Sequence, residues 1–572
     1  MKRWVWFLVC AILGLVSLVC GLLVPAHLRA VDASVIRQAG RNTPTLLELG
    51  RALVSDNNLG AAQLISDAAE QEKLPDRDNL NLAIGNLAAR NPELQTWGGG
   101  ESRWQNLFDS SVGLTNSGSV PLTDFVVRLE NRNRVLAYLQ HSPLPAVQEL
   151  LRTRELTNTV VFSPSASASG QAFDAAVSVC GLLMDGSHLS AGLSNEVFAA
   201  ALQANRTGNS EPLEQVLLNV MSLGQRFNCG QLIAFVKRIQ TAETLRLMAN
   251  LVRHADSQLP ILFSAVQLSG QPREVAGYLM NFSQSGLTDL GSSLRYGAGG
   301  LNEILQRNRR LHASGFNQEL QSFAPFGAFE SFASAFALRL PWWALTAKWL
   351  LYLAGGFLLA LSLHFARPAV SALERPLQVR GFHLAREFLF AIGFLLVVLL
   401  LSEPFLSQEN QKVEFPFRLH LPTMGVAVPA GNPSVPTTVM SQPSLLIILL
   451  FFVLQALLYT ACLVKLAEIR RQQVMPRVKL KLLENEDHLF DAGLYLGFLG
   501  TIISLVLSSI GVFQQVNLMV AYSSTSFGII FVSFFKICHL RPARRKLLLE
   551  VDAHASTEET APPAAAALAS PV

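Results

Sequence analysis

The chain has 572 residues and a net charge of +4, and only 15% of its residues are charged while 50% are hydrophobic. Soluble domains carry about 25% charged residues, so this composition excludes an ordinary water-soluble protein. The basic residues gather beside apolar runs, so we expect a membrane protein with no nucleic-acid partner.

Six apolar runs predict membrane-spanning helices. A helix rises 1.5 Å per residue, so about 20 apolar residues cross the hydrocarbon core. Runs of this kind lie at about 4–24, 342–365, 387–401, 445–464, 490–513 and 518–535. Backbone groups in lipid must be satisfied within the segment, so each run should be helical. The sequence therefore predicts an all-α, polytopic membrane protein with six transmembrane helices.

The first run can be read in two ways. Lys2 and Arg3 followed by an apolar stretch also begin a cleaved signal peptide. The stretch is longer than the usual signal core, and no small-x-small cleavage site follows it. We therefore favour an uncleaved transmembrane anchor over 1–29.

Basic loops set the expected orientation, because loops rich in Lys and Arg stay in the cytoplasm. Such residues precede the first helix and crowd the loops after the second, fourth and sixth helices. In contrast, the stretch 403–444 has only Lys412 and Arg418. The prediction is a cell inner membrane protein with both termini inside and with 25–340 extracytoplasmic.

Residues 30–340 read as a water-exposed helical domain. Apolar stripes at helical spacing occur at 46–53, 213–221 and 245–252, and strand-like alternation is scarce. Short helices between polar turns predict an α-solenoid or an irregular bundle; a solenoid-like array is favoured, although no repeat of fixed period is present. Cys180 and Cys229 are either one disulfide or two buried free thiols.

No chemistry-bearing motif occurs in this domain. HExxH, Walker A, G-x-S-x-G and paired CxxC motifs are absent from the sequence, and its histidines have no metal-ligand spacing. We therefore predict no enzyme activity, no catalytic residue, no metal and no cofactor, and we expect a binding or spacer role.

Small and hydroxyl residues line one face of each of the last two helices. They recur three or four residues apart, which places them on one helical face; the set is Gly493, Gly497, Gly500, Thr501, Ser504, Ala521, Ser524, Thr525 and Gly528. Such a face serves close helix packing, chiefly through its glycines. It also suits a narrow polar lining beside an ion or proton carrier.

Two short segments of these helices carry a family resemblance. The fifth helix contains Leu499-Gly500-Thr501-Ile502-Ile503, and the sixth contains Ala521-Tyr-Ser-Ser-Thr525-Ser-Phe-Gly528-Ile. They resemble the Leu-Gly-Thr-Val and Ala-Leu-x-x-Thr-Ala-x-Gly-Leu segments of the MotA/TolQ/ExbB proton-channel family. The resemblance covers about 443–540 and includes the order of an inward helix, a cytoplasmic loop and a hairpin.

The resemblance implies a complex of two kinds of subunit. Thr501 and Thr525, with Ser504 and Ser524, would line the inside of a homo-oligomeric ring, usually a pentamer. A single-span partner like ExbD, TolR or MotB would supply the titratable Asp, because the last two helices have no central acid. The competing interpretation of each threonine is a hydroxyl bonded to its own helix.

The chain also departs from that family. The loop 467–488 is short, and Phe534-Phe535-Lys536 stands where a proline often follows the last motif. We predict two accessory helices at 341–405, an extracytoplasmic loop at 406–442 and a disordered cytoplasmic tail at 541–572. Lys348, one turn inside the second span, is expected to extend to the lipid–water interface. The function predicted is a channel-type subunit of a proton-driven envelope complex; the alternative is a membrane-anchored scaffold or sensor.

Overall fold

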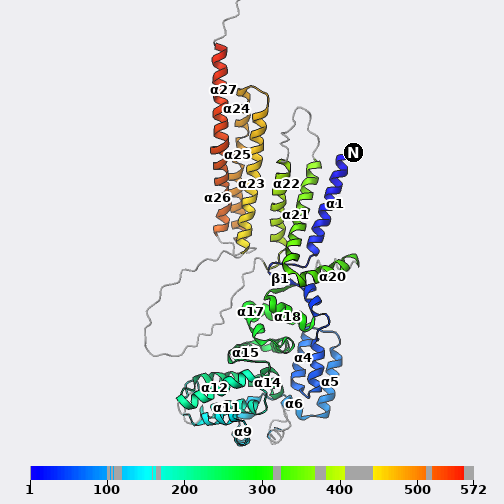
Figure 1. Ribbon diagram of the computed structural model, residues 1–572, viewed down its shortest axis with the longest axis vertical. Helices are drawn as coiled ribbons and strands as arrows, with labels where there is room; N and C mark the ends of the chain where they lie inside the picture. Colours follow the sequence, from blue (N-terminus) through cyan, green and yellow to red (C-terminus); the bar gives the residue numbers. More distant parts are fainter. Residues whose placement is uncertain are drawn as a thin grey trace, which may run out of the picture. The chain divides into compact units, whose positions relative to one another are not determined.

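The protein is all-α in the computed structural model, apart from one pair of three-residue strands (Figure 1). The structure describes residues 2–99, 104, 107, 119–156, 159–162, 169–313, 324–366, 382–405, 442–509 and 518–559. Among these, five helices are long and apolar enough to cross a membrane. They indicate a multi-pass membrane protein.

The chain forms two compact units. The membrane unit contains Met1–Arg29 and the described residues from Arg339 onward, and the helical unit contains Ala30–Leu338. Each unit has its own core.

The first part of the membrane unit consists of α1 (Lys2–Leu23), α21 (Pro341–Ala366) and α22 (Phe382–Ser402). Helix α21 packs against both α1 and α22. The third predicted span, 387–401, corresponds to the apolar part of α22, Glu387–Ser402, which is shorter than the other five spans. The ammonium of Lys348 is buried and does not reach water as expected: the residue is only 1% exposed, and Nζ donates to Ala26 O in the segment after α1.

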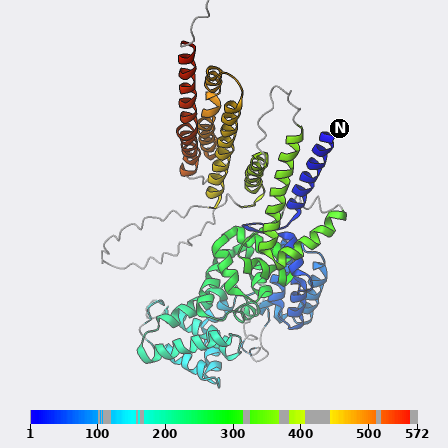
Figure 2. The same cartoon turned by 45° about the horizontal axis from the view of Figure 1, so that its top comes forward.

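The second part consists of α23 (Gln442–Arg471), α24 (Pro476–Asn485), α25 (Asp487–Ser509) and α26 (Leu518–Phe535). A π-helical turn, η5 (Lys536–Leu540), leads into α27 (Arg541–Glu559). Helices α23, α25 and α26 lie side by side in both views (Figures 1 and 2). The prediction of a disordered tail from 541 is wrong as far as Glu559, because the α27 residues Ala543 and Leu547 are buried with α24 and α23 residues in one apolar cluster. The predicted loop at 406–442, the turn between α25 and α26 and the end of the tail lie outside the described residues, except that Gln442 begins α23.

Short helices make up the helical unit. Its elements are β1 (Ala30–Asp32), α2 (Ala33–Gly40), α3 (Leu46–Ser55), α4 (Leu59–Gln71), α5 (Arg77–Arg90), α6 (Glu93–Trp97), α8 (Leu122–Val127), α9 (Leu129–Gln140), α10 (Pro145–Arg152), η2 (Thr153–Glu155), α11 (Ser169–Asp185), α12 (Ala191–Thr207), α13 (Glu211–Gly224), α14 (Cys229–Val236), α15 (Ala242–Ala255), η3 (Asp256–Gln258), α16 (Leu259–Ser269), α17 (Pro272–Leu294), α18 (Gly297–Arg307), β2 (Arg310–His312) and α20 (Ala324–Arg339). Helices two places apart contact each other in series: α9, α11, α13, α15 and α17 in one, and α14, α16 and α18 in another.

Apolar stripes account for the core of this unit. Most residues of the α13 and α15 stripes are buried as their spacing predicts, and Met221, Leu247 and Leu251 are partly exposed. The rings of Phe227, Phe235 and Phe263 pack together without exposure. The stripe of α3 is wrong in part, because Ala52 is exposed while Gly50 faces α5. A Cβ at Gly50 would lie 2.8 Å from the Leu80 side chain, so a close helix contact takes the place of the expected apolar one.

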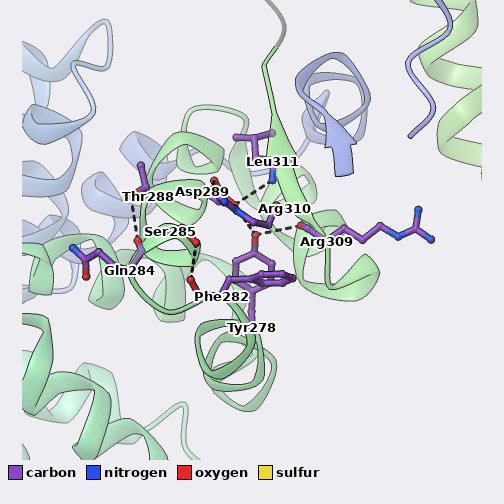
Figure 3. Close-up of polar contacts among 9 residues, drawn as sticks. All are labelled: Tyr278, Phe282, Gln284, Ser285, Thr288, Asp289, Arg309, Arg310 and Leu311. Atoms are coloured by element: carbon purple, nitrogen blue, oxygen red, sulfur yellow. Dashed lines mark hydrogen bonds and ion pairs between the residues drawn. The ribbon is translucent and has the colours of Figure 1, made fainter. Parts of the chain in front are cut away.

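A polar cluster joins the two strands to α17 (Figure 3). The strands pair in parallel, with Ala30 opposite Arg310 and Asp32 opposite His312. The buried Asp289 carboxylate accepts hydrogen bonds from Arg310 Nε at 3.0 Å, Leu311 N at 3.2 Å and Tyr278 OH at 3.2 Å. Burial, followed by the charge of Asp289, raises the pKa of Tyr278. Several donors therefore satisfy this buried carboxylate, which fixes β2 on α17.

Candidate functional site

The predicted glycines lie where the backbones of α25 and α26 approach each other. A Cβ at Gly497 would lie 2.8 Å from Ser524 O and 3.2 Å from Thr525 Cα. A Cβ at Gly528 would lie 2.6 Å from Gly493 O. Only glycine permits this contact, because the neighbouring atoms belong to backbone and cannot rotate away. At Gly500 the neighbours are side-chain atoms instead, those of Ser524 and Phe451.

This approach brings the two predicted threonines together. Thr501 Oγ1 and Thr525 Oγ1 are 2.6 Å apart, and either hydroxyl can donate to the other. Both also reach Gly497 O, at 3.1 Å from Thr501 and 3.3 Å from Thr525. Two hydroxyl protons thus serve three contacts, so one donates to the carbonyl and the other to its partner's oxygen. Rotating both hydroxyls exchanges these roles without moving a helix.

The predicted serines are placed differently from each other. Ser524 is 1% exposed and lies at the contact with Gly500. Ser504 donates to Gly500 O at 2.8 Å, within its own helix. Thr501, 7% exposed, also bonds its own helix through Gly497 O. Three of the four predicted residues, Thr501, Thr525 and Ser524, therefore meet at one place, and Ser504 stands apart.

Gln455 of α23 completes the site, and sequence reasoning overlooked it. Its side chain is 2% exposed, and Nε2 donates to Gly493 O at 3.0 Å. The amide thus ties α23 to the same glycine face, and its Oε1 accepts no hydrogen bond within the described chain. The available signal was the single amide side chain in the apolar run 445–464, since buried polar groups in membrane helices are seldom incidental.

Two ion pairs and one Tyr–His contact connect the helices at one end of this group. Asp491 pairs with Lys536 at 2.6 Å, and Asp487 pairs with Arg544 at 2.6 Å. Tyr459 OH lies 2.9 Å from His539 Nε2 within η5. Each pair joins residues from different helices, so the contacts fasten α23 and α25 to the π-helical turn and α27. A π-helical turn of this kind inside a longer helix often marks a functional position.

The site contains hydroxyls and amides but no titratable group between its threonines. Helices α25 and α26 contain two acidic residues, Asp487 and Asp491, and both lie in the first turns of α25. Within the described residues no group of three His, Cys, Asp or Glu side chains could hold a metal ion. The arrangement can bind or orient a polar group, but α25 and α26 place no carboxylate beside the two threonines.

Comparison with known proteins gives no relative. No protein-family model, no curated protein and no solved structure matches this chain. The MotA/TolQ/ExbB resemblance therefore remains a hypothesis founded on two motifs.

Proposed function

We propose that the chain is an inner-membrane protein with six spans, both termini in the cytoplasm, and residues 25–340 outside. The five long apolar helices support this topology, with Glu387–Ser402 as a sixth, shorter crossing. An even number of spans puts all the basic loops on one side, as the distribution of Lys and Arg requires.

The function that the geometry supports best is that of a channel-type subunit in a proton-motive-force-driven complex acting on the cell envelope. The observation that carries it is the Thr501–Thr525 pair, whose hydroxyls meet at 2.6 Å between α25 and α26. These are the two threonines that the family resemblance assigns to a pore. Thr525 remains partly exposed, so its hydroxyl can contact a neighbouring chain.

Such a subunit works only with others. The threonine pair has no acid beside it, so the proton-carrying Asp comes from a single-span partner of the ExbD, TolR or MotB kind. Several copies of this chain surround that partner in a ring. The helical unit then transmits force or recognises the envelope as a solenoid-like array, which the serial contacts of α9, α11, α13, α15 and α17 support.

A second candidate function is a membrane-anchored scaffold or sensor without ion flux. It is favoured by the internal satisfaction of the same hydroxyls, since both threonines lie within hydrogen-bond distance of Gly497 O and of each other in one chain. In this case the glycine face and the threonine pair serve helix packing alone.

Replacing Thr525 by Val separates the two functions. Val keeps the shape of Thr but removes the hydroxyl, and Thr501 can still donate to Gly497 O. The proposal predicts that Thr525→Val abolishes proton flux in proteoliposomes that contain the chain with its co-purified partner, while assembly is kept. Ser526→Ala is the matched control, because the exposed Ser526 hydroxyl bonds only the Tyr522 carbonyl of its own helix, at 3.0 Å. Absence of flux from the wild-type complex would favour the scaffold or sensor, and wild-type flux that Thr525→Val leaves unchanged would overturn the role of Thr525.

A further inference from the structure

A second buried polar site lies in the other part of the membrane unit, where α1 ends, α21 begins and α22 ends. It contains three ionisable side chains: Lys348 from α21, Glu403 after α22 and His27 after α1. Lys348 is 1% exposed, and the side chains of His27 and Glu403 are 7% and 1% exposed. Ionisable groups withdrawn from water in a membrane protein need mutual compensation and usually have a function.

The three groups are arranged around one nitrogen atom. Lys348 Nζ donates to Ala26 O at 2.7 Å and lies 3.3 Å from His27 Nδ1. The same His27 Nδ1 lies 3.8 Å from Glu403 Oε2. Glu403 Oε2 is held in place by the Leu28 backbone N–H at 2.8 Å. His27 Nδ1 therefore stands between a cation and an anion, both fixed by backbone groups of the segment that follows α1.

His27 Nδ1 can form a hydrogen bond with Lys348 or with Glu403, but not with both at once. An ammonium group only donates hydrogen bonds, and an ionised carboxylate only accepts them. Nδ1 can accept from Lys348 while it carries no proton, and it can donate to Glu403 only when it carries one. Lys348 and Glu403 already neutralise each other, so a proton on His27 gives the buried group a net charge of +1.

One further titratable side chain lies beside these three. Tyr352, one turn along α21 from Lys348, is fully buried and interacts with Ser402 and Glu403. Glu403 Oε1 has no hydrogen-bond partner among the described residues, so the carboxylate keeps an acceptor position open. A static Lys–Glu pair would need no imidazole between its members.

We propose that His27, Lys348 and Glu403 form a proton-binding site. Uptake of one proton by His27 Nδ1 breaks its hydrogen bond from Lys348 and forms one to Glu403. Lys348 keeps its bond to Ala26 O, so charge repulsion between Lys348 and the imidazolium is offset by Glu403. Its histidine and the backbone groups that fix its Lys and Glu belong to 24–29, the segment that joins α1 to the helical unit in the chain. The site does not depend on the Thr501–Thr525 pair.

The test follows histidine protonation by solid-state NMR of the full chain, labelled with ¹⁵N-histidine, in lipid bilayers. The proposal predicts that the signal lost in His27→Gln changes from that of a neutral to that of a protonated imidazole when the pH is lowered from 9 to 4. Lys348→Met should move its midpoint to an about tenfold lower proton concentration, because a like charge is removed. Glu403→Gln should move the midpoint about tenfold in the opposite direction, because the counter-charge is removed.

His364→Gln is the matched control, since His364 lies at the other end of α21. The His364→Gln variant should lose the His364 signal and leave the midpoint of the His27 signal unchanged. A His27 signal that keeps one protonation state from pH 4 to 9 would overturn the proposal, and so would shifts of the same sign in the two charge variants. If either charge variant fails to fold, the comparison of wild type with His27→Gln decides alone, because it shows whether His27 titrates.

Discussion

Gly497→Ala probes the close approach of α25 and α26 in the membrane. The added Cβ would lie 2.8 Å from Ser524 O and 3.2 Å from Thr525 Cα, against ordinary contacts of about 3.5 Å or more. Both neighbours are backbone atoms, so the helices themselves must separate by several tenths of an ångström. Overpacking of this kind costs about 1–3 kcal/mol.

A second glycine serves as a control that separates the cost of overpacking from the effect of helix propensity. Ala is better than Gly inside a helix by about 0.5–1 kcal/mol, and this gain applies equally to Gly393→Ala in α22. There the new Cβ meets only Val453 Cγ1 at 3.5 Å, an ordinary contact. The difference in free energy of unfolding between the two variants should therefore equal the overpacking term, about 1–3 kcal/mol.

The assay is reversible unfolding of the full chain in mixed micelles with an increasing fraction of SDS. Gly497→Ala should unfold at a lower SDS fraction than wild type, while Gly393→Ala should be unchanged or slightly more stable. Equal midpoints for the two variants would show that α25 and α26 do not touch at Gly497.

Three further predictions concern the helical unit. Burial raises the pKa of Glu214, but hydrogen bonds from Ser210 and from the N–H groups of Phe162, Val160 and Val161 outweigh it, so the folded pKa lies below the usual value. A carboxyl group whose pKa is lower in the folded than in the unfolded state stabilises the fold at pH values above its unfolded pKa, about 4.3. This stabilisation is lost as the pH falls through the pKa of the folded state. Glu214→Gln should therefore lose about 1–3 kcal/mol at pH 7 and less near pH 3, as followed by thermal unfolding, and equal losses at both pH values would contradict this. Cys180 is fully buried, which raises its pKa to about 12, so it should resist iodoacetamide at pH 8 until the chain is denatured. Cys180 and Cys229 form no disulfide, so mass spectrometry should find both alkylated after denaturation without reductant; an unlabelled pair would show a disulfide. Gly85→Ala in α5 should raise the unfolding free energy by about 0.5–1 kcal/mol, because the new Cβ meets nothing within 4 Å, and a lower melting temperature would refute this.

The membrane helices could be predicted because their length follows from bilayer thickness and their apolar content from the cost of burying polar groups. The expected run 518–535 has the bounds of α26, Leu518–Phe535. The meeting of Thr501 and Thr525 also follows from local information, since small residues at helical spacing on a hairpin must face each other. Their role in conduction is a separate claim that packing alone does not decide.

Contacts between distant parts of the chain could not be predicted. Lys348 binds Ala26 O across 322 positions, so no window of sequence shows that its ammonium is buried. Its position near a helix end favoured the water interface instead, because an isolated lysine there extends toward water. Gln455 was visible in the sequence, but its partner Gly493 lies 38 positions away. Similarly, the polar composition of α27 did not indicate a packed helix. Its burial comes from packing against α24.

The central claim is that this chain is one subunit of a ring around an Asp-bearing partner. Native mass spectrometry of the full-length complex, purified from membranes in mild detergent, tests it most directly. We expect several copies of the 62.4 kDa chain together with a small single-span protein that has an Asp in its membrane helix. A lone monomer without any such partner would contradict the account.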